Sequence, residues 1–362
     1  MSTLETNSIG KYSGNNVSID DALNLKSYTT AQRDALTSVA GDMIYNSDDN
    51  KPQIYNGSAW ENFGPAGFDV QYVVVAGGGS GGQAQPGGTK GGGGGAGGYR
   101  SSVTGENTGG GGSAETPFRA VTGTNYNVSI GAGATAFPAS TASFLDYRVP
   151  FTTYSGEFSY FDNIVSIGGG TGGIWTNIDG FYGGSGGGSA TSANGLGQGG
   201  EALKPTQGYA GGDFAGSAGS GGGGGAGAAG VDASNNTGGN GGNGQTTSIT
   251  GSSQTFAGGG GGGGASTAGT GGTGGGGNGA SGNAGGSAGT ANTGGGGGGS
   301  SWVNTSPTGA NGGAGGSGRI ILLYPDTYTI TVGAGLTGTE TNRGDGYKYV
   351  DITAGTGTVS WS

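Results

Sequence analysis

The chain has 362 residues, of which 100 are Gly, 9 are Pro and none is Cys or His. The glycine runs at 258–264 and 294–299 break any Gly-X-Y register and exclude a collagen triple helix, while the lack of Cys excludes disulfides and thiolate metal sites. The net charge is -10 and Lys and Arg form no cluster, so the sequence favours neither nucleic-acid binding nor an anionic membrane as partner.

The first segments, residues 1–63, have ordinary composition and predict a small α+β module. The stretch TTAQRDALTSVA offers Thr29 or Thr30 as the N-cap of a short helix that ends by Gly41. The N-terminal residues lack the basic and apolar regions of a signal peptide. A protein that works outside a cell is then expected to leave it by another route, such as release within a particle.

A hairpin is predicted next, from β-runs at 43–45 and 53–55 on either side of a polar turn. Tyr45, Tyr55 and Trp60 are expected to form a small aromatic face on it. A module of this size buries little core, so we expect it to join an oligomer.

The second region, residues 68–325, begins and ends with an apolar strand and is otherwise dominated by glycine. We expect these strands to anchor the two ends of the glycine region, through Val73, Val74 and Val75 at the start and Ile320, Ile321 and Leu322 at the end. After Pro325, residues 326–362 predict a separate small β-structure of short strands. Its stretch TYTITVGAGLT repeats the pattern of NYNVSIGAGAT at 125–135.

The glycine tracts have two interpretations. As a linker they stay disordered, because ordering a glycine costs more than one hydrogen bond returns. Alternatively, several tracts pack side by side as left-handed helices with three residues per turn. Only glycine allows the backbones of neighbouring helices to lie close enough to bond to one another. The fold expected here is mainly β and irregular, with packed polyglycine-II helices held by short β-strands.

The junctions between strands and glycine resemble a known family. DVQYVVVAGGGSGG, GGGGGAGGYRSS, NYNVSIGAGA, SITGSSQTFAGGGGGGG, TANTGGGGGGS and GGAGGSGRIILLYP follow one another as in the glycine-rich domain of tailed-phage tail fibres and adhesins. The stretch LKSYTTAQRDALTSVAGDMIYNSDDNKPQIYNGSAWENF is similar to a module of fibre proteins in T4-like phages and cyanophages. The resemblance implies a virion protein that is a homo-oligomer, as a rule a trimer, or is carried on a trimer. It also implies contacts with other tail or fibre proteins, and loops displayed to a host surface glycan or outer-membrane protein.

An aromatic insert at 144–182 and Trp302 supply the candidate receptor contacts. Exposed aromatic rings stack on sugars or anchor protein partners, but in a chain with so few apolar side chains they also serve as a small core. The candidates for receptor binding are Tyr160, Phe161, Trp175, Phe181, Tyr182 and Trp302.

Catalysis is not expected. Glu157, Asp162 and Asp179 lie near these aromatic residues, and paired carboxylates hydrolyse glycosides, but solvated surface charge is the commoner explanation for such residues. Without His or Cys a histidine-based triad is impossible, and we expect no metal and no cofactor. The longest apolar runs are too short to span a bilayer, so no membrane insertion is expected.

The functional hypothesis is therefore a non-enzymatic tail fibre or fibre-tip adhesin, assembled in the host cytoplasm and located on the virion. The alternative is a head or neck fibre, or a capsid decoration protein, without receptor binding. A third class is a glycine-helix ice-binding or wall protein, which requires a flat face of regularly spaced Thr.

Overall fold

The computed structural model describes residues 24–63, 67–85, 87–139, 154–175, 178–191, 197–203, 205, 207–215, 218–303 and 309–362. The chain divides into two compact units, Met1–Ala66 and Gly67–Ser362. The structure is mainly β and irregular, as the sequence predicts. No helix within the described ranges is long and apolar enough to cross a membrane.

The first unit is a four-stranded sheet with one short helix, which confirms the predicted hairpin and helix start. The strand order is β1-β2-β3-β4. Thr29 caps the helix, accepting from the Gln32 N–H while the Gln32 side chain accepts from the Thr29 N–H. The elements are β1 (Ser27–Tyr28), α1 (Thr30–Asp34), β2 (Met43–Asn46), β3 (Lys51–Tyr55) and β4 (Trp60–Asn62).

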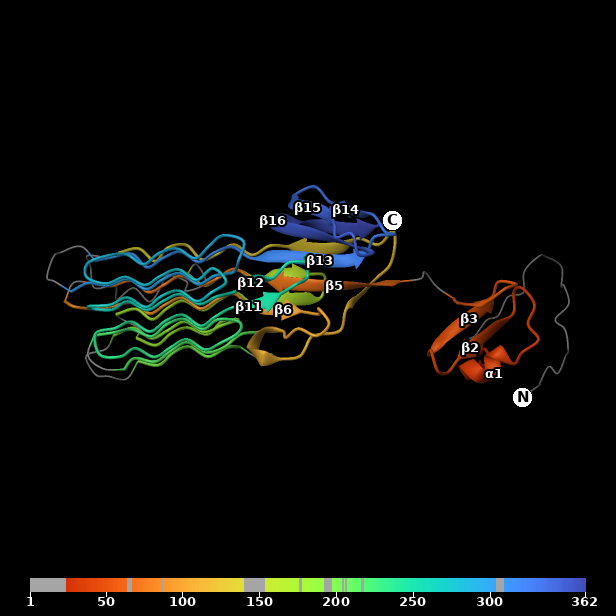
Figure 1. Cartoon of the computed structure of the whole chain (residues 1–362), viewed down its shortest axis with the longest axis horizontal. Coiled ribbons are helices and arrows are strands. Elements are labelled where there is room, and N and C mark those ends of the chain that lie inside the picture. Colours follow the sequence, from red (N-terminus) through yellow and green to blue (C-terminus); the bar gives the residue numbers. More distant parts are fainter. Residues whose placement is uncertain are drawn as a thin grey trace, which may run out of the picture. The chain divides into compact units, whose positions relative to one another are not determined.

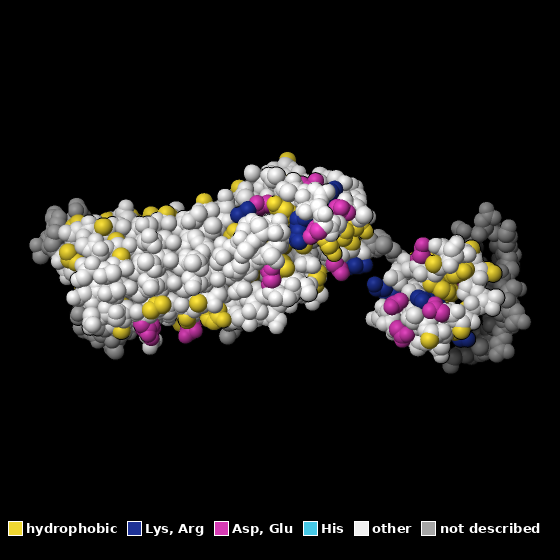
Figure 2. All heavy atoms as spheres, in the orientation of Figure 1, with side chains coloured by type: hydrophobic (Ala, Val, Ile, Leu, Met, Phe, Trp, Pro, Cys, Tyr) yellow, Lys and Arg dark blue, Asp and Glu magenta, His cyan; other side chains and the backbone are white. Residues whose placement is uncertain are grey.

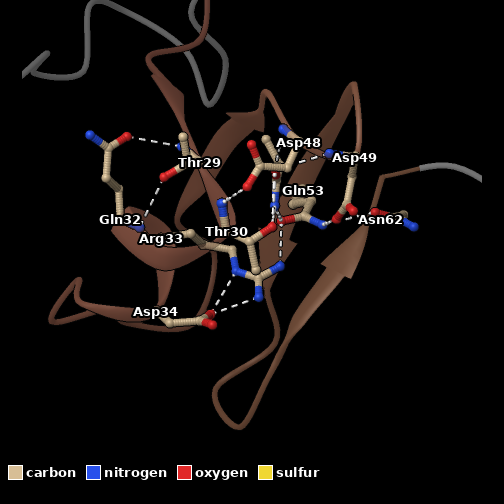
Figure 3. Close-up of polar contacts among 10 residues, drawn as sticks. Thr29, Thr30, Gln32, Arg33, Asp34, Asp48, Asp49, Gln53 and Asn62 are labelled. Carbon is tan, nitrogen blue, oxygen red and sulfur yellow. Dashed lines mark hydrogen bonds and ion pairs between the residues drawn. The ribbon is translucent and has the colours of Figure 1, made fainter.

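Between α1 and the sheet lies a polar network rather than an apolar core (Figure 3). Gln53 is buried and its side-chain oxygen accepts from Arg33 at 3.0 Å and from Asn46 at 3.2 Å. Its amide nitrogen donates to Asp49 at 2.8 Å and to Asn62 at 2.9 Å. Every hydrogen-bonding position of Gln53 is thus used, which offsets the cost of burying it.

The predicted aromatic face is only partly formed. Tyr55 lies opposite Trp60 across β3 and β4, and their ring centroids are 5.4 Å apart. Tyr45 lies opposite Pro52, one residue out of phase with Gln53 and Tyr55, so its side chain is on the other side of the sheet. Tyr45 instead donates from its hydroxyl to Asn50.

The second unit contains a curved, nearly closed sheet whose path runs β10-β9-β8-β16-β13-β5-β6 (Figure 1). β14 and β15 also pair with β16, and β7 pairs with β5. The Ser166 hydroxyl on β10 donates to the Val74 carbonyl on β5 at 2.7 Å, which draws the two sides of the curve together. The strands of this sheet are β5 (Phe68–Val75), β6 (Tyr99–Ser101), β7 (Phe118–Ala120), β8 (Tyr126–Ser129), β9 (Ser159–Phe161), β10 (Ile164–Ser166), β13 (Arg319–Pro325), β14 (Ile330–Val332), β15 (Leu336–Asn342) and β16 (Tyr347–Trp361).

The predicted anchor strands are central to this sheet, but they do not hold opposite ends of the glycine region. β5 and β13 are antiparallel neighbours, with Val74 opposite Ile320 and Val73 opposite Ile321. Both therefore lie at the same end of the glycine tracts (Figure 1). The chain leaves the sheet after β5 and returns to it at β13, so the two strands are neighbours although about 240 residues separate them. The order of residues in the sequence does not reveal this pairing.

Alternating side chains of β5 and β13 enter two apolar cores, so both faces of this strand pair are buried. On one face Val74, Ile320 and Leu322 pack with the aromatic rings around Trp361. On the other face Val73, Val75 and Ile321 pack with residues of a separate two-stranded sheet, formed by β11 (Gln245–Thr247) and β12 (Gln254–Phe256). The short 3-10 helix η1 (Gly109–Gly111) contacts β6.

The C-terminal segment is part of this sheet and not a separate unit, contrary to the expected boundary at 325. The stretches YKYVDI and TVSW are one strand, β16, which crosses Gly355 with φ +99°. Its first half pairs with β13, and its second half lies between β14 and β8. The two repeated sequence patterns thus flank the same strand, with Tyr126 and Val332 both opposite Val359.

The glycine tracts between residues 76 and 318 pack side by side into one ordered body, here called the glycine array (Figure 1). Tract 91–98 shows the pattern. Its N–H groups donate in turn to three different tracts, so that every third residue bonds to the same neighbouring tract. Residues 91, 94 and 97 donate to residues 300, 297 and 294. Residues 92, 95 and 98 donate to residues 173, 170 and 167, and residues 93 and 96 donate to residues 221 and 224. Three residues per turn is the repeat of a polyglycine-II helix.

The carbonyl groups of the same tract accept from three further tracts. They bond to N–H groups in tracts 76–82, 183–190 and 258–264. Tract 91–98 therefore has six hydrogen-bonded neighbours and satisfies its backbone without a side chain. A Cβ atom built on Gly94 would overlap the carbonyl oxygen of Gly79, and one on Gly260 would overlap that of Gly297. Glycine is the packing residue here, and the linker interpretation is wrong for these tracts.

Candidate functional site

The tracts reverse direction at two ends of the array, one beside the strands and one away from them, here called the far end (Figure 1). At the far end a turn closes tracts 76–85 and 90–98. Its Gly87 and Gly88 have φ +107° and +90°, a backbone region that side chains rarely adopt. The Thr89 hydroxyl donates to the Gln85 carbonyl at 2.8 Å and fixes the base of this turn.

Lys90 is buried beneath the turn, with 2% of its surface exposed. Its ammonium group donates to the carbonyl oxygens of Gly88 at 2.6 Å and Trp302 at 3.3 Å. Burial lowers the pKa of the Lys90 ammonium group below its usual value. Sequence reasoning missed this residue, because a single Lys among glycines looks like a solubilising charge.

Trp302 lies in the interior and is not a surface contact, in contrast to its prediction as a receptor contact. Only 8% of it is exposed, and it packs with Ala84 and Ala310 in a small apolar cluster. Its backbone N–H donates to the Thr89 carbonyl at 3.0 Å. Lys90 and Trp302 together hold the far-end turns on the body of the array.

Trp175 is exposed at the far end, with 46% of its surface open. Its tract is antiparallel to tract 91–98, since Gly92 donates to Gly173 and Gly95 to Gly170. That register places Trp175 about level with Lys90. Val303, next to the buried Trp302, is 45% exposed.

The remaining predicted receptor residues do not gather at the far end. Tyr182 is 64% exposed but lies on the side of the array, since Phe181 donates to Thr171 and Gly184 to Gly168. Phe181 is half-buried beside it. Tyr160, also half-buried, is in β9 at the end that carries the strands.

Phe161 is corrected from a candidate contact to a core residue. It is fully buried, and the centroid of its ring lies 4.6 Å from that of Phe118 and 6.4 Å from that of Trp361. The core interpretation of the aromatic insert is therefore right for this residue. Phe144, Tyr147 and Phe151 of the insert lie outside the described residues.

The three acidic residues considered for catalysis are dispersed among local contacts. Glu157 accepts from the Ala132 N–H at 3.2 Å, and Asp179 accepts from the Gln198 N–H at 2.9 Å. Asp162 occupies the turn between β9 and β10 with φ 51°. No group of three or more acidic side chains placed to hold a metal ion is found in the described part of the chain.

Charged side chains are unevenly distributed over the second unit. On the face that Figure 2 shows, Lys and Arg gather around the strands, while the array is largely uncharged with a few acidic side chains. Near the strands, Glu115 accepts from the Arg100 Nε at 3.0 Å and from the Tyr72 hydroxyl at 2.8 Å. Arg100, Glu115 and Tyr72 thus link β6 and β5 to the segment that follows η1.

The comparison with known families rests on the same glycine tracts and strands. A family model described as a glycine-rich domain matches residues 57–325. The chain belongs to this glycine-rich domain family. The match takes in the array and the strand pair β5 and β13 but stops before β14 to β16, which complete the sheet of this glycine-rich domain. No curated protein matches the sequence.

Proposed function

We propose that this glycine-rich protein is a structural component of a phage virion, a tail fibre or fibre-tip adhesin that recognises a host surface receptor with the far end of its array. The observation that supports the proposal most directly is the position of Trp175, exposed where the tracts turn and held by a backbone-bonded body. Aromatic groups on a rigid support bind with little loss of conformational entropy. The receptor is proposed to be a glycan or an outer-membrane protein, bound without catalysis.

The proposal includes assembly as a homo-oligomer, with a trimer as the expected state. The sheet of the first unit supports this: α1 lies on one face, and the other face carries Met43, Tyr45, Pro52 and Ile54. Met43 is 37% exposed and the other three are half-buried. A second copy would cover this apolar surface, which a module with so small a core needs. Mass measurement of the purified protein tests the state.

Location is tested by gold-labelled antibody against this protein on intact virions. Label on the tail supports the proposal. Label on the head or neck favours the alternative of a head fibre or decoration protein, and particles without label contradict both.

Receptor recognition is tested by adsorption. Purified wild-type protein is expected to block adsorption of the phage to its host, and Trp175→Ala is expected to lose that block. Tyr182→Ala is the matched control, because Tyr182 is exposed on the side of the array. If Tyr182→Ala loses the block while Trp175→Ala keeps it, recognition lies on the side and the far-end proposal is wrong.

A further inference from the structure

A second candidate binding site lies in the first unit, away from the array. A pocket of 360 Å³ is lined by the end of α1, by the residues that follow it, and by the ends of β3 and β4 with the turn that joins them. This volume is at the small end of the range for ligand pockets. Its lining residues are Arg33, Asp34, Leu36, Ser38, Tyr55, Ser58, Ala59 and Trp60.

Two aromatic rings form one corner of this pocket. The centroids of Tyr55 and Trp60 are 5.4 Å apart and their planes are inclined by 54°. Both residues are only half-buried, although they oppose each other on adjacent strands. Inclined rings present a face and an edge to one ligand, which suits a rigid molecule with C–H groups on one side.

Polar groups line the same pocket. The Arg33 guanidinium group is held by the Asp34 carboxylate at 2.7 Å and by the Gln53 side-chain oxygen at 3.0 Å (Figure 3). Asp34 keeps 59% of its side chain exposed and so retains acceptor capacity. The Ser38 hydroxyl is buried and has no hydrogen-bond partner within the described residues. A buried hydroxyl without a partner is uncommon in a folded protein and is a position that a ligand can satisfy.

We propose that this pocket binds a neutral saccharide, with one sugar ring seated on Tyr55 and Trp60. The C–H face of a sugar matches the apolar rings, and its hydroxyls both donate and accept, as Asp34, Arg33 and Ser38 require. Because Arg33 is paired with Asp34, the pocket carries no unbalanced charge to select an anion or a cation. The mixed polar lining likewise does not favour a purely apolar ligand.

The test is a titration of the full chain with the methyl glycosides of glucose, galactose, mannose and N-acetylglucosamine, followed by the indole N–H NMR signal of Trp60. At least one sugar is expected to shift this signal in a saturable way. Tyr55→Ala, which removes the other ring of the corner and keeps the Trp60 reporter, should weaken that sugar at least tenfold. Asp34→Asn, which changes an exposed carboxylate without removing volume, should weaken it severalfold.

Tyr347→Ala, which alters an exposed tyrosine of the second unit, is the control and should leave the affinity unchanged. No shift of the Trp60 signal with any of the four sugars, or equal binding by wild type and Asp34→Asn, would overturn the proposal. The signal of Trp60 itself is the readout, so sugar binding at the far end of the array neither mimics nor hides the result. The saccharide site is thus independent of the proposed receptor site.

Discussion

The N–H of Gly94 donates to the carbonyl oxygen of Gly297 at 2.7 Å, joining two tracts that are remote in sequence. The N–H of Gly297 donates onward to Gly79, and the carbonyl of Gly94 accepts from Gly260. Each backbone group thus links a different pair of tracts, and the array is held by hydrogen bonds where other cores rely on side-chain packing. At interior glycine positions such as Gly94 and Gly260 there is no room for a methyl group.

Gly94→Ala is expected to destabilise the second unit by about 3 kcal/mol, the upper part of the usual range for overpacking. The new Cβ would overlap the carbonyl oxygen of Gly79, and backbone atoms cannot move aside as a side chain can. The free energy of unfolding, measured by denaturant titration, checks this.

Gly285→Ala is the matched control for Gly94→Ala, because its nearest heavy atom would be the Asn311 carbonyl oxygen at 3.0 Å and Gly285 is exposed. We expect a smaller loss, below about 1 kcal/mol, since exchange of Gly for Ala also restricts the unfolded chain. Equal losses in the two variants would mean that close packing of the tracts does not determine stability.

Trp361→Ala is expected to destabilise the sheet by about 3–5 kcal/mol, as other large-to-small changes in apolar cores do. Trp361 is 1% exposed, and its ring contacts Phe68, Tyr126 and Tyr324. Trp175→Ala makes the same chemical change at a site 46% exposed, and should alter stability by less than about 0.5 kcal/mol. Thermal unfolding of both variants measures these losses. A loss of stability in Trp175→Ala as large as that in Trp361→Ala would contradict the exposed position of Trp175.

Much of this fold follows from local sequence signals. The helix N-cap at Thr29, the hairpin around 46–51 and the strands at β5 and β13 depend on capping, turn and β-propensity, which act within a few residues. The pairing of β5 with β13 and the return of β16 depend on contacts between distant segments, so no local pattern indicated them.

The candidate site was harder to predict for the same reason. Trp175 and Trp302 each follow a glycine tract within three residues, yet one is exposed and the other buried. The difference arises from which tracts lie beside each residue, and that is fixed by the register of hydrogen bonds across the array. Gly at every third residue of a tract is the sequence signal which predicts that this side of the tract faces the interior of the array.

Raising the pH above about 10, the usual tyrosine pKa, is expected to destabilise the second unit. Burial and then the hydrogen bond to Glu340 raise the pKa of the Tyr324 hydroxyl above that value. The unfolded chain therefore loses this proton first and binds fewer protons than the folded chain, so stability falls as pH rises. Burial, followed by the charge of Glu115, acts in the same direction on the pKa of Tyr72.

Thermal unfolding between pH 8 and pH 11 measures this loss, and Tyr324→Phe is the variant that isolates one group. It removes the titrating hydroxyl but keeps the buried ring, so the stability of the variant should fall less steeply with pH than that of the wild type. An equal or steeper fall in Tyr324→Phe would show that the hydroxyl does not titrate as its burial requires.

Asn240→Ala is expected to loosen the edge of the array. Tract 267–273 is an edge tract: its inward N–H groups at 269 and 272 bond to Gly262 and Gly259, whereas the N–H of Thr270 donates to the Asn240 side-chain oxygen at 2.9 Å. Asn243 accepts from Thr273 in the same way, at 3.2 Å. A side chain thus replaces the carbonyl of a missing neighbour. Removing it should cost about 0.5–1.5 kcal/mol, the net value of one hydrogen bond.

Asn240→Asp keeps an oxygen in the accepting position and should retain slow exchange of the Thr270 amide hydrogen, while Asn240→Ala should accelerate it. Hydrogen exchange followed by NMR distinguishes the two, because an amide is protected only while its bond is closed. If the Thr270 amide exchanges equally slowly in both variants, the Asn side chain is not its partner in solution. In that case Asn240 and Asn243, which stand three residues apart in their tract, do not close the edge of the array. The outer tract must then pack against another surface.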